Sequence, residues 1–321
     1  MGENVHRHDQ NFDQKYKEHL HRKIAELKKE RDAIILAHNY QREEIQEVAD
    51  IKGDSYALAV AATKAKNKVI AFCGVLFMAE GAAMLNPDKT VLLPVKEAGC
   101  PLAEMITVDK LRKKKEEYPE AAVVCYVNSS AAVKAESDIC CTSSNAVEIV
   151  KAMKEDKIIF VPDKNLGRYV REHVPDKELI LWDGYCVTHM RLTMEEVLKA
   201  KELYPGAEFL AHPECRKEVL ELANYVGSTA GILKYVKGSS AKEFIIGTEN
   251  GLIYQLTQDN PGKKFYMPTN EFVCANMKLT TLGWLARSLE QMMYVITVPE
   301  NIAVKARKTL SRMIDVMEAK K

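Results

Sequence analysis

Three of the eight cysteines lie at matching places in three similar stretches of the chain, and together they have the chemistry of a metal site. They are Cys100 in "KEAGCPL", Cys186 in "WDGYCV" and Cys274 in "EFVCAN". Three thiolates suit a zinc ion or an iron-sulfur cluster. A 4Fe-4S cube held by three cysteines keeps one iron free of protein ligands, and that iron can act as a Lewis acid toward a substrate oxygen.

The other cysteines are better explained as core residues, because free cysteine is among the most frequently buried residue types. Cys73, Cys125, Cys140 and Cys141 lie inside apolar runs, whereas Cys215, directly after "HPE", fits either interpretation. We expect the chain to remain in the cytoplasm, where the reducing conditions disfavour disulfides.

Polar side chains that can exchange protons recur upstream of the three cysteines. The pattern places His38 and Tyr40 in "AHNY", Tyr126 and Asn128 in "CYVNS", and His212 and Glu214 in "AHPEC". Histidine and glutamate exchange protons near neutral pH, and tyrosine can donate to a developing oxyanion. Each residue alone is equally well explained as a hydrogen-bonded strand end. Their recurrence at one structural position favours a common site.

Small hydroxyl residues recur where helices are expected to begin. They are Ser55 in "GDSYALA", Thr142 and Ser143 in "CTSSNAV", and Ser228 and Thr229 in "GSTAGIL". Such residues usually cap a helix, but a helix start is also a ready anion site because its free amides and positive dipole end point outward. Three such starts around one axis suit a ligand, or a pair of ligands, with three anionic groups.

These residues belong to a repeat that predicts the fold. Apolar strands alternate with helical patterns, which indicates parallel sheets flanked by helices. The repeat keeps its length: 62 residues separate His38 from Cys100, 58 separate Asn128 from Cys186, and 62 separate His212 from Cys274. We therefore predict an α/β protein of three similar αβα units, each with a small parallel sheet. Open parallel sheets bind ligands at the carboxyl ends of their strands, so an approximate threefold axis would bring the cysteines together.

Helices are expected at both ends of the repeat. Tyr16, Leu20, Ile24 and Leu27 form one stripe of an amphipathic helix, and two C-terminal helices are expected near residues 278–295 and around a face with Leu310, Met313, Ile314 and Met317. The predicted division is an N-terminal helical segment at 1–31, αβα units at 32–118, 119–204 and 205–276, and C-terminal helices at 277–321.

Composition excludes several classes of protein. Forty-six basic and forty-five acidic residues give a net charge of +1, so no overall field favours nucleic acid or an anionic membrane as partner. The longest uncharged apolar run, residues 69–79, is far shorter than the roughly 20 residues of a membrane helix. No GxGxxG or GxxxxGK[ST] motif is present, so nicotinamide and nucleoside triphosphate sites lack their fingerprints.

From about residue 30 to 320 the chain resembles the quinolinate synthase A family. The resemblance is carried by ordered blocks that include "LAHNYQREEIQEVADIKGDSYALA", "AGCPLAEM", "YVNSSAAVKAESDICCTSSNAV", "PDKNLGRYV", "WDGYC", "HPEC", "YVGSTAGI", "IIGTENG" and "CANMK". It implies three αβα units around a pseudo-threefold axis and a 4Fe-4S cluster on Cys100, Cys186 and Cys274. The implied reaction condenses iminoaspartate with dihydroxyacetone phosphate to quinolinate, phosphate and water in NAD biosynthesis. An L-aspartate-oxidising enzyme that supplies iminoaspartate is an implied partner.

The resemblance also implies a set of site residues. The substrate-binding residues would be His38, Ser55, Tyr126, Val127, Asn128, Ser143, His212, Pro213, Glu214 and Thr229. We expect Glu214 to act as a base with His212 in support, and Tyr126 and Tyr40 to polarise or reprotonate intermediates. A closing movement that keeps water from the imine is expected. The segment "GYCVTHM" departs from the pattern of some members, so the part played by His189 is left open.

Two other readings of the same residues compete with this one. The first is a zinc-dependent lyase or hydrolase that uses the same three thiolates with an open fourth position. The second is a non-enzymatic scaffold of three repeats with a structural metal.

Overall fold

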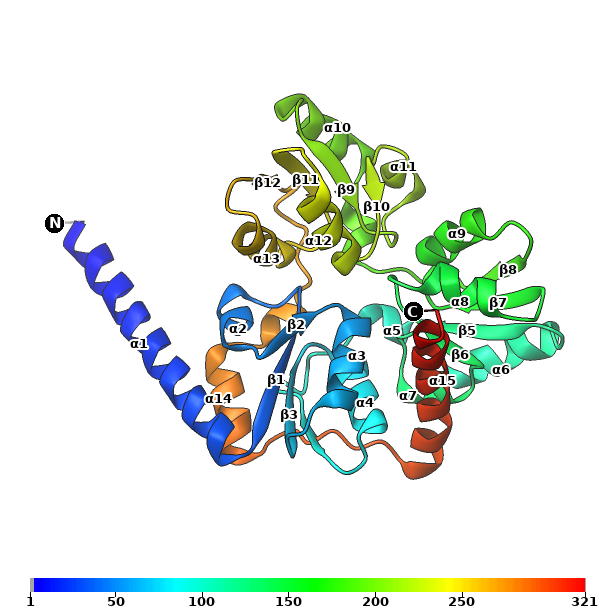
Figure 1. Ribbon diagram of the computed structural model, residues 1–321, viewed down its shortest axis with the longest axis horizontal. Coiled ribbons are helices and arrows are strands. Elements are labelled where there is room, and N and C mark those ends of the chain that lie inside the picture. Colours follow the sequence, from blue (N-terminus) through cyan, green and yellow to red (C-terminus); the bar gives the residue numbers. More distant parts are fainter. Residues whose placement is uncertain (1–2, 321) are drawn as a thin grey trace.

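The computed structural model describes the backbone of residues 3–320 and the side chains of residues 14–320. Within this part of the chain, twelve strands form three four-stranded sheets, and helices lie against them. Figure 1 shows the three sheets in separate lobes arranged about a central region. The predicted fold class is confirmed: three αβα units follow one another along the chain.

Each unit repeats the same sheet topology. The strand orders are β2-β1-β3-β4, β6-β5-β7-β8 and β10-β9-β11-β12, and every neighbouring pair is parallel. The first strand of each unit is therefore central, and the short second and fourth strands lie at the edges. Central strands such as β3 (Val69–Cys73) are buried along their whole length, which explains their uninterrupted apolar sequence.

The elements of the three units follow in chain order. The first unit contains β1 (Ala33–His38), α2 (Glu43–Val48), β2 (Ile51–Gly53), α3 (Ser55–Lys64), β3, α4 (Leu76–Leu85), β4 (Thr90–Leu92), α5 (Pro101–Glu104) and α6 (Val108–Glu117). The second contains β5 (Ala122–Tyr126), α7 (Ala131–Ala135), β6 (Ile139–Cys141), α8 (Ala146–Ala152), β7 (Lys157–Val161), α9 (Lys164–His173), β8 (Glu178–Leu181), the 3₁₀ turn η1 (His189–Arg191) and α10 (Met194–Leu203). The third contains β9 (Glu208–Ala211), α11 (Lys217–Leu220), β10 (Tyr225–Val226), α12 (Thr229–Gly238), β11 (Glu243–Gly247), α13 (Leu252–Asp259) and β12 (Lys264–Tyr266). The boundaries expected between units stay a prediction.

The helices outside the repeat tie the units together. Helix α1 (Glu3–Glu30) packs against α14 (Leu282–Gln291), and α15 (Glu300–Glu318) packs against α4 and α7, so the chain returns from the third unit to the first two. Both predicted C-terminal helices are present, after the 3₁₀ turn η2 (Met277–Leu279). The N-terminal stripe is buried at three of its four positions, and its first residue, Tyr16, is 53% exposed.

One side-chain hydrogen bond is repeated in all three units. Asp50 accepts the backbone N–H of Ile35, Asp138 accepts that of Val123, and Asn224 accepts that of Phe209, each across 15 residues and at 2.7–2.8 Å. The acceptor precedes the second strand and the donor lies in the first, so the bond ties the two strands together. Its recurrence at one offset is independent evidence that the units are structurally equivalent.

This bond predicts an unequal effect of two substitutions at one position. In Asp138→Ala the buried Val123 N–H loses its acceptor, which should lower the free energy of unfolding by about 1–2 kcal/mol. Asp138→Asn should cost much less, because Asn224 performs the same task in the third unit. Urea unfolding followed by circular dichroism measures both values. Equal losses in the two variants would contradict the prediction.

The other five cysteines lie in the hydrophobic core. Cys73, Cys125, Cys140 and Cys141 are buried among the apolar residues of the first two units, as predicted. Cys215 is also buried, in the core of the third unit. No helix in the described part of the chain combines the length and the apolar character needed to cross a membrane.

Candidate active site

A cavity lies where the three units meet. Of the residues expected at the site, the cavity is lined by His38, Tyr40, Ser55, Cys100, Tyr126, Asn128, Ser143, Cys186, His212, Glu214, Thr229 and Cys274. Val127 and Pro213 do not line it, and Val127 instead lines a smaller, mostly apolar cavity nearby. The roles expected of all these residues stay predictions.

Each of the three recurring cysteines follows the fourth strand of its unit. Cys100 comes after β4, Cys186 after β8 and Cys274 after β12, and all three are partly exposed to the cavity. Burial raises the pKa of the Cys100 thiol to about 12 and also raises the pKa of Cys186, which the negative charge of Glu214 raises further. Desolvated thiols keep their protons unless a cation replaces them.

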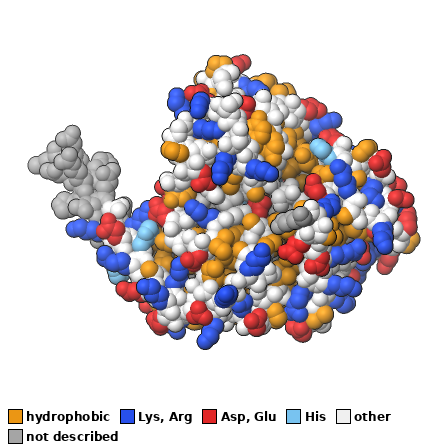
Figure 2. All heavy atoms as spheres, viewed as in Figure 1, with side chains coloured by type: hydrophobic (Ala, Val, Ile, Leu, Met, Phe, Trp, Pro, Cys, Tyr) orange, Lys and Arg blue, Asp and Glu red, His pale blue; other side chains and the backbone are white. Residues whose placement is uncertain are grey.

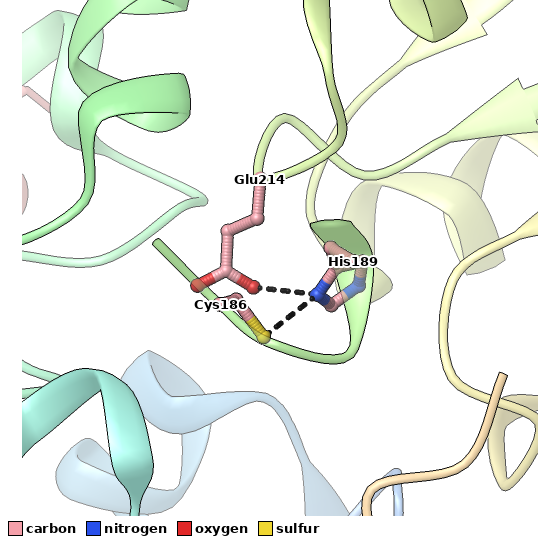
Figure 3. A group of neighbouring side chains, drawn as sticks. All are labelled: Cys186, His189 and Glu214. Carbon is pink, nitrogen blue, oxygen red and sulfur yellow. Dashed lines mark hydrogen bonds and ion pairs between the residues drawn. The ribbon is translucent and has the colours of Figure 1, made fainter. Parts of the chain in front are cut away.

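His189 is the centre of a hydrogen-bonded chain that the sequence did not reveal. Its Nδ1 lies 2.9 Å from Glu214 Oε2 and 3.2 Å from Cys186 Sγ, as Figure 3 shows. Its Nε2 lies 3.0 Å from the hydroxyl of Thr248, which in turn lies 2.6 Å from the hydroxyl of Tyr40. Hydrogen bonds therefore connect Tyr40 to Glu214 through Thr248 and His189.

The negative charge of Glu214 fixes which atom donates in the hydrogen bond between His189 and Glu214. An ionised carboxylate can only accept, so Nδ1 of His189 donates to it. When that is the only proton of the ring, Nε2 accepts from Thr248, and the Thr248 oxygen then accepts from Tyr40. Only the position of His189, three residues after Cys186, hinted at this role in the sequence, and Thr248 gave no signal.

His212 links the second and third units beside this chain. The backbone N–H of Glu214 donates to His212 Nδ1 over 3.3 Å, so the ring proton lies on Nε2, which is 3.2 Å from the hydroxyl of Ser143. The ring stacks on that of His189 with 4.6 Å between centroids. Asn165 donates to the backbone oxygen of Glu214 at 3.0 Å and so also holds this loop against the second unit.

Burial sets the protonation of the site. Burial by itself would raise the pKa of Glu214, but the charge and hydrogen bond of His189, with help from His212 and Tyr126, outweigh it and lower that pKa. Burial lowers the pKa values of His38 and His212 to about 3. It raises the pKa of Tyr126 well above its usual value, as does the negative charge of Glu214. At neutral pH the Glu214 carboxyl is thus ionised, His38 and His212 are uncharged, and Tyr126 keeps its proton.

Some of the remaining polar groups at the site have hydrogen-bond partners in the described part of the chain, and others do not. His38 Nδ1 accepts the N–H of Tyr40 at 3.1 Å, and Asn39 donates to the Thr229 hydroxyl at 3.0 Å across the first and third units. Two buried acceptors that face the cavity, Asn128 Oδ1 and Glu214 Oε1, have no hydrogen-bond partner among the described residues. A buried acceptor without a partner is costly, which is expected where a ligand supplies the donor.

The predicted helix starts are correct for two units and shifted in the other. Ser55 is the first residue of α3, and Thr229 is the first residue of α12 after the capping Ser228. Ser143 lies three residues before α8, because the Asn145 side chain accepts the N–H of Thr142 and forms a turn ahead of the helix. Ser55, Ser143 and Thr229 nevertheless line the same cavity.

Comparison with known proteins agrees with these features. The family model described as quinolinate synthetase A protein matches residues 22–315. A quinolinate synthase of Clostridium kluyveri is 55% identical over 91% of this chain and 97% of its own length. Those of Caldicellulosiruptor saccharolyticus and Methanosarcina barkeri are each 53% identical, over 93% and 92% of this chain and 99% and 96% of their own lengths. The chain belongs to the quinolinate synthetase A family.

Proposed function

We propose that this protein is a quinolinate synthase that condenses iminoaspartate with dihydroxyacetone phosphate, giving quinolinate, phosphate and two waters. The full-length similarity to proteins of that name supports the activity. The observation that carries the proposal for the site is that one cavity gathers three cysteines, three histidines, two glutamates and two tyrosines from all three units.

Cys100, Cys186 and Cys274 would hold a 4Fe-4S cluster. The donor set fits, because three thiols that are partly buried open onto one cavity next to groups able to bind substrate. When bound, such a cluster supplies an iron without a protein ligand, which is a Lewis acid. The chain's own part is to hold three thiolates and to keep the surroundings dry.

The arrangement of the thiols does not favour a single zinc ion on the same three cysteines. Tetrahedral zinc, with Zn–S of about 2.3 Å, needs sulfurs about 3.8 Å apart. Among the described residues, the ligand atoms that lie within 4.8 Å of one another belong to Cys186, His189 and Glu214, and the three cysteine sulfurs do not form such a group.

The cavity offers sites for the three anionic groups of the two substrates, which are two carboxylates and one phosphate. Ser55 and Thr229 place the amide ends of α3 and α12 at the cavity, and Ser143 adds a hydroxyl from the second unit. Asn128 and its free oxygen would accept a substrate N–H or O–H. These contacts would orient both substrates without an arginine cluster.

Proton transfer would use the ionised Glu214 and the protonated tyrosines. Glu214 has one oxygen on His189 and the other free to face the substrate, so it would take a proton from the condensing carbon. His212 holds the loop of Glu214, because its Nδ1 accepts the Glu214 N–H and its Nε2 faces the hydroxyl of Ser143. Tyr126, and Tyr40 at the end of the hydrogen-bonded chain, would donate to substrate oxygens. The burial of these groups would help keep water from the imine.

The two hydrogen bonds of the Thr248 hydroxyl give a testable prediction. Thr248→Val keeps the shape of the side chain but removes the hydroxyl that joins Tyr40 to His189. Loss of about one such hydrogen bond in the transition state should lower kcat about tenfold and leave KM nearly unchanged. Steady-state kinetics under anaerobic conditions measure both constants. A rise in KM at constant kcat would assign Thr248 to substrate binding instead.

Iminoaspartate is an unstable imine, so we expect it to come from an enzyme that oxidises L-aspartate in the same compartment. The cytoplasm is the compartment that suits an oxygen-sensitive cluster and eight free cysteines.

Anaerobic synthesis tests the proposed function directly. Protein purified without oxygen is mixed with dihydroxyacetone phosphate and iminoaspartate generated in place, and quinolinate is measured by chromatography. Quinolinate that depends on both substrates and on protein-bound iron is the expected result. Iron-loaded, folded protein that forms none would contradict the proposal.

A further inference from the structure

Two buried carboxylates have no part in the chemistry described above. Asp163 follows β7 in the second unit, and Glu249 follows β11 in the third. Both are fully buried, with relative exposures of 0%. A carboxylate in such a place needs partners that offset the cost of removing it from water. Their partners are the loops that carry two of the three cysteines.

Asp163 joins the start of α9 to the Cys186 loop. One oxygen accepts the N–H of Leu166 at 2.8 Å, and the other accepts the N–H of Cys186 at 2.9 Å. The approach requires Gly184, because any side chain there would collide with the backbone oxygen of Pro162. The cysteine loop therefore lies directly on the turn that holds Asp163.

Glu249 does the same for Cys274. One oxygen accepts the N–H of Cys274 at 3.0 Å, and the other accepts the N–H of Gly251 at 2.7 Å. Lys278 lies 3.0 and 3.1 Å from the two oxygens and also donates to the backbone oxygen of Tyr40 at 2.6 Å. The carboxylate is thus paired with a partly buried cation that also touches the first unit.

In the part of the chain that the structure describes, the first unit has no equivalent carboxylate, and its cysteine loop is held by a different hydrogen bond. Val75 follows its third strand, and among the described residues no carboxylate accepts the N–H of Cys100. Instead Asn276, two residues after Cys274, donates to the backbone oxygen of Gly99 at 2.9 Å. The position of the Cys100 loop therefore depends on the loop that Glu249 holds.

We propose that Asp163 and Glu249 are positioning residues that hold Cys186 and Cys274 in their metal-binding conformation before metal arrives. The proposal rests on the assignment of these cysteines as cluster ligands. Each carboxyl group accepts a cysteine N–H at 2.9–3.0 Å and a second backbone N–H at 2.7–2.8 Å, so it ties the cysteine backbone to a neighbouring turn. Groups that orient metal ligands commonly change metal affinity by 10–100-fold when they are replaced.

Asp163→Asn and Glu249→Gln test this with little change in shape. A carboxamide has one acceptor oxygen, so it can serve only one of the two N–H groups that each carboxylate now accepts. We expect both variants, purified without oxygen, to release iron to a chelator at least about ten times faster than the wild type. Iron and sulfide content and the visible absorption of the cluster follow the loss.

Asp138→Asn is the matched control. It makes the same chemical change in a carboxylate that accepts a backbone N–H in the second unit, but its partner is Val123 in a strand and not a cysteine. It should release iron at the wild-type rate. If all three variants lose iron equally, the effect is a general loss of stability and the proposal is wrong.

The remaining outcomes separate this proposal from the proposed function. Wild-type protein without iron and sulfide would show that the cysteines do not hold a cluster, and both proposals about them would fall. Wild-type release rates in Asp163→Asn and Glu249→Gln would overturn the positioning role and leave the cluster assignment intact.

A measurement on the wild-type chain covers the case in which a variant does not fold. In the metal-free protein the amides of Cys186 and Cys274 should exchange hydrogen at least about ten times more slowly than in an unstructured peptide, because the carboxylates already hold them. Mass spectrometry of fragments that contain each cysteine reports the rate. Rapid exchange at both amides would show that the loops are not held before metal binds.

Discussion

Cys186→Ala is expected to abolish quinolinate formation and the brown colour of the cluster while the chain stays folded. The thiol lies at the cavity, 3.2 Å from His189, and packs at the edge of the core instead of within it. Two cysteines would hold the cluster poorly, so we expect iron content to fall several-fold and activity to fall at least about 10³-fold. Metal analysis, circular dichroism and the anaerobic assay measure the three quantities.

Cys73→Ala is the control for this prediction. Cys73 is fully buried in β3 and has no contact with the cavity, so its loss should lower stability and leave iron content unchanged. A structural scaffold would behave differently, because loss of Cys186 would then unfold the protein. A folded Cys186→Ala enzyme with normal activity would refute the role of this cysteine.

Glu214→Gln is expected to lower kcat by about 10²–10⁴-fold, the usual contribution of a general base. The amide keeps the size of the side chain but cannot take a proton, and it removes the charge that orients His189 and His212. Iron content should stay at the wild-type level, because Glu214 is not one of the proposed ligands. This separates loss of the base from loss of the cluster.

A surface glutamate supplies the comparison for this variant. Glu221 is exposed and lies 3.6 Å from Lys217, one turn away, so Glu221→Gln should change neither kcat nor iron content measurably. If Glu214→Gln keeps more than about a tenth of the wild-type kcat, the base must be another group. If it loses iron, the close group of Cys186, His189 and Glu214 binds metal in a way not proposed here.

The charge of the molecular surface agrees with a site that recognises its ligands locally. Figure 2 shows acidic and basic side chains interspersed over the visible face, as the net charge of +1 suggests. Attraction of anionic substrates therefore depends on the cavity itself, where helix ends and hydroxyl groups replace a basic patch.

Several features of the fold were readable from local patterns. Buried runs such as residues 69–73 predicted strands, and the 3.6-residue spacing of Leu310, Met313 and Ile314 predicted the last helix. Where that helix packs was not predictable. Helix α15 lies against α4 and α7, far from it along the chain, because its apolar face complements both units at once.

The candidate site was predicted unevenly for a related reason. The cysteines and the residues near His38, Tyr126 and His212 could be found because a repeat of nearly constant length places equivalent positions at equivalent strand ends. His189 and Thr248 occur in single units, so no repetition marked them, and their roles arise from contacts between different units.

Asp163 and Glu249 show most clearly which features the sequence predicts and which depend on tertiary packing. In the chain they belong to polar loops that are indistinguishable from surface turns. Burial turns them into acceptors for Cys186 and Cys274, since a carboxylate shut away from water must find donors nearby. Chain order and residue type were enough for the repeat, the family and the three recurring cysteines, because these depend on spacing along the polymer. The hydrogen bonds that connect the three units depend on packing, which only the folded chain establishes.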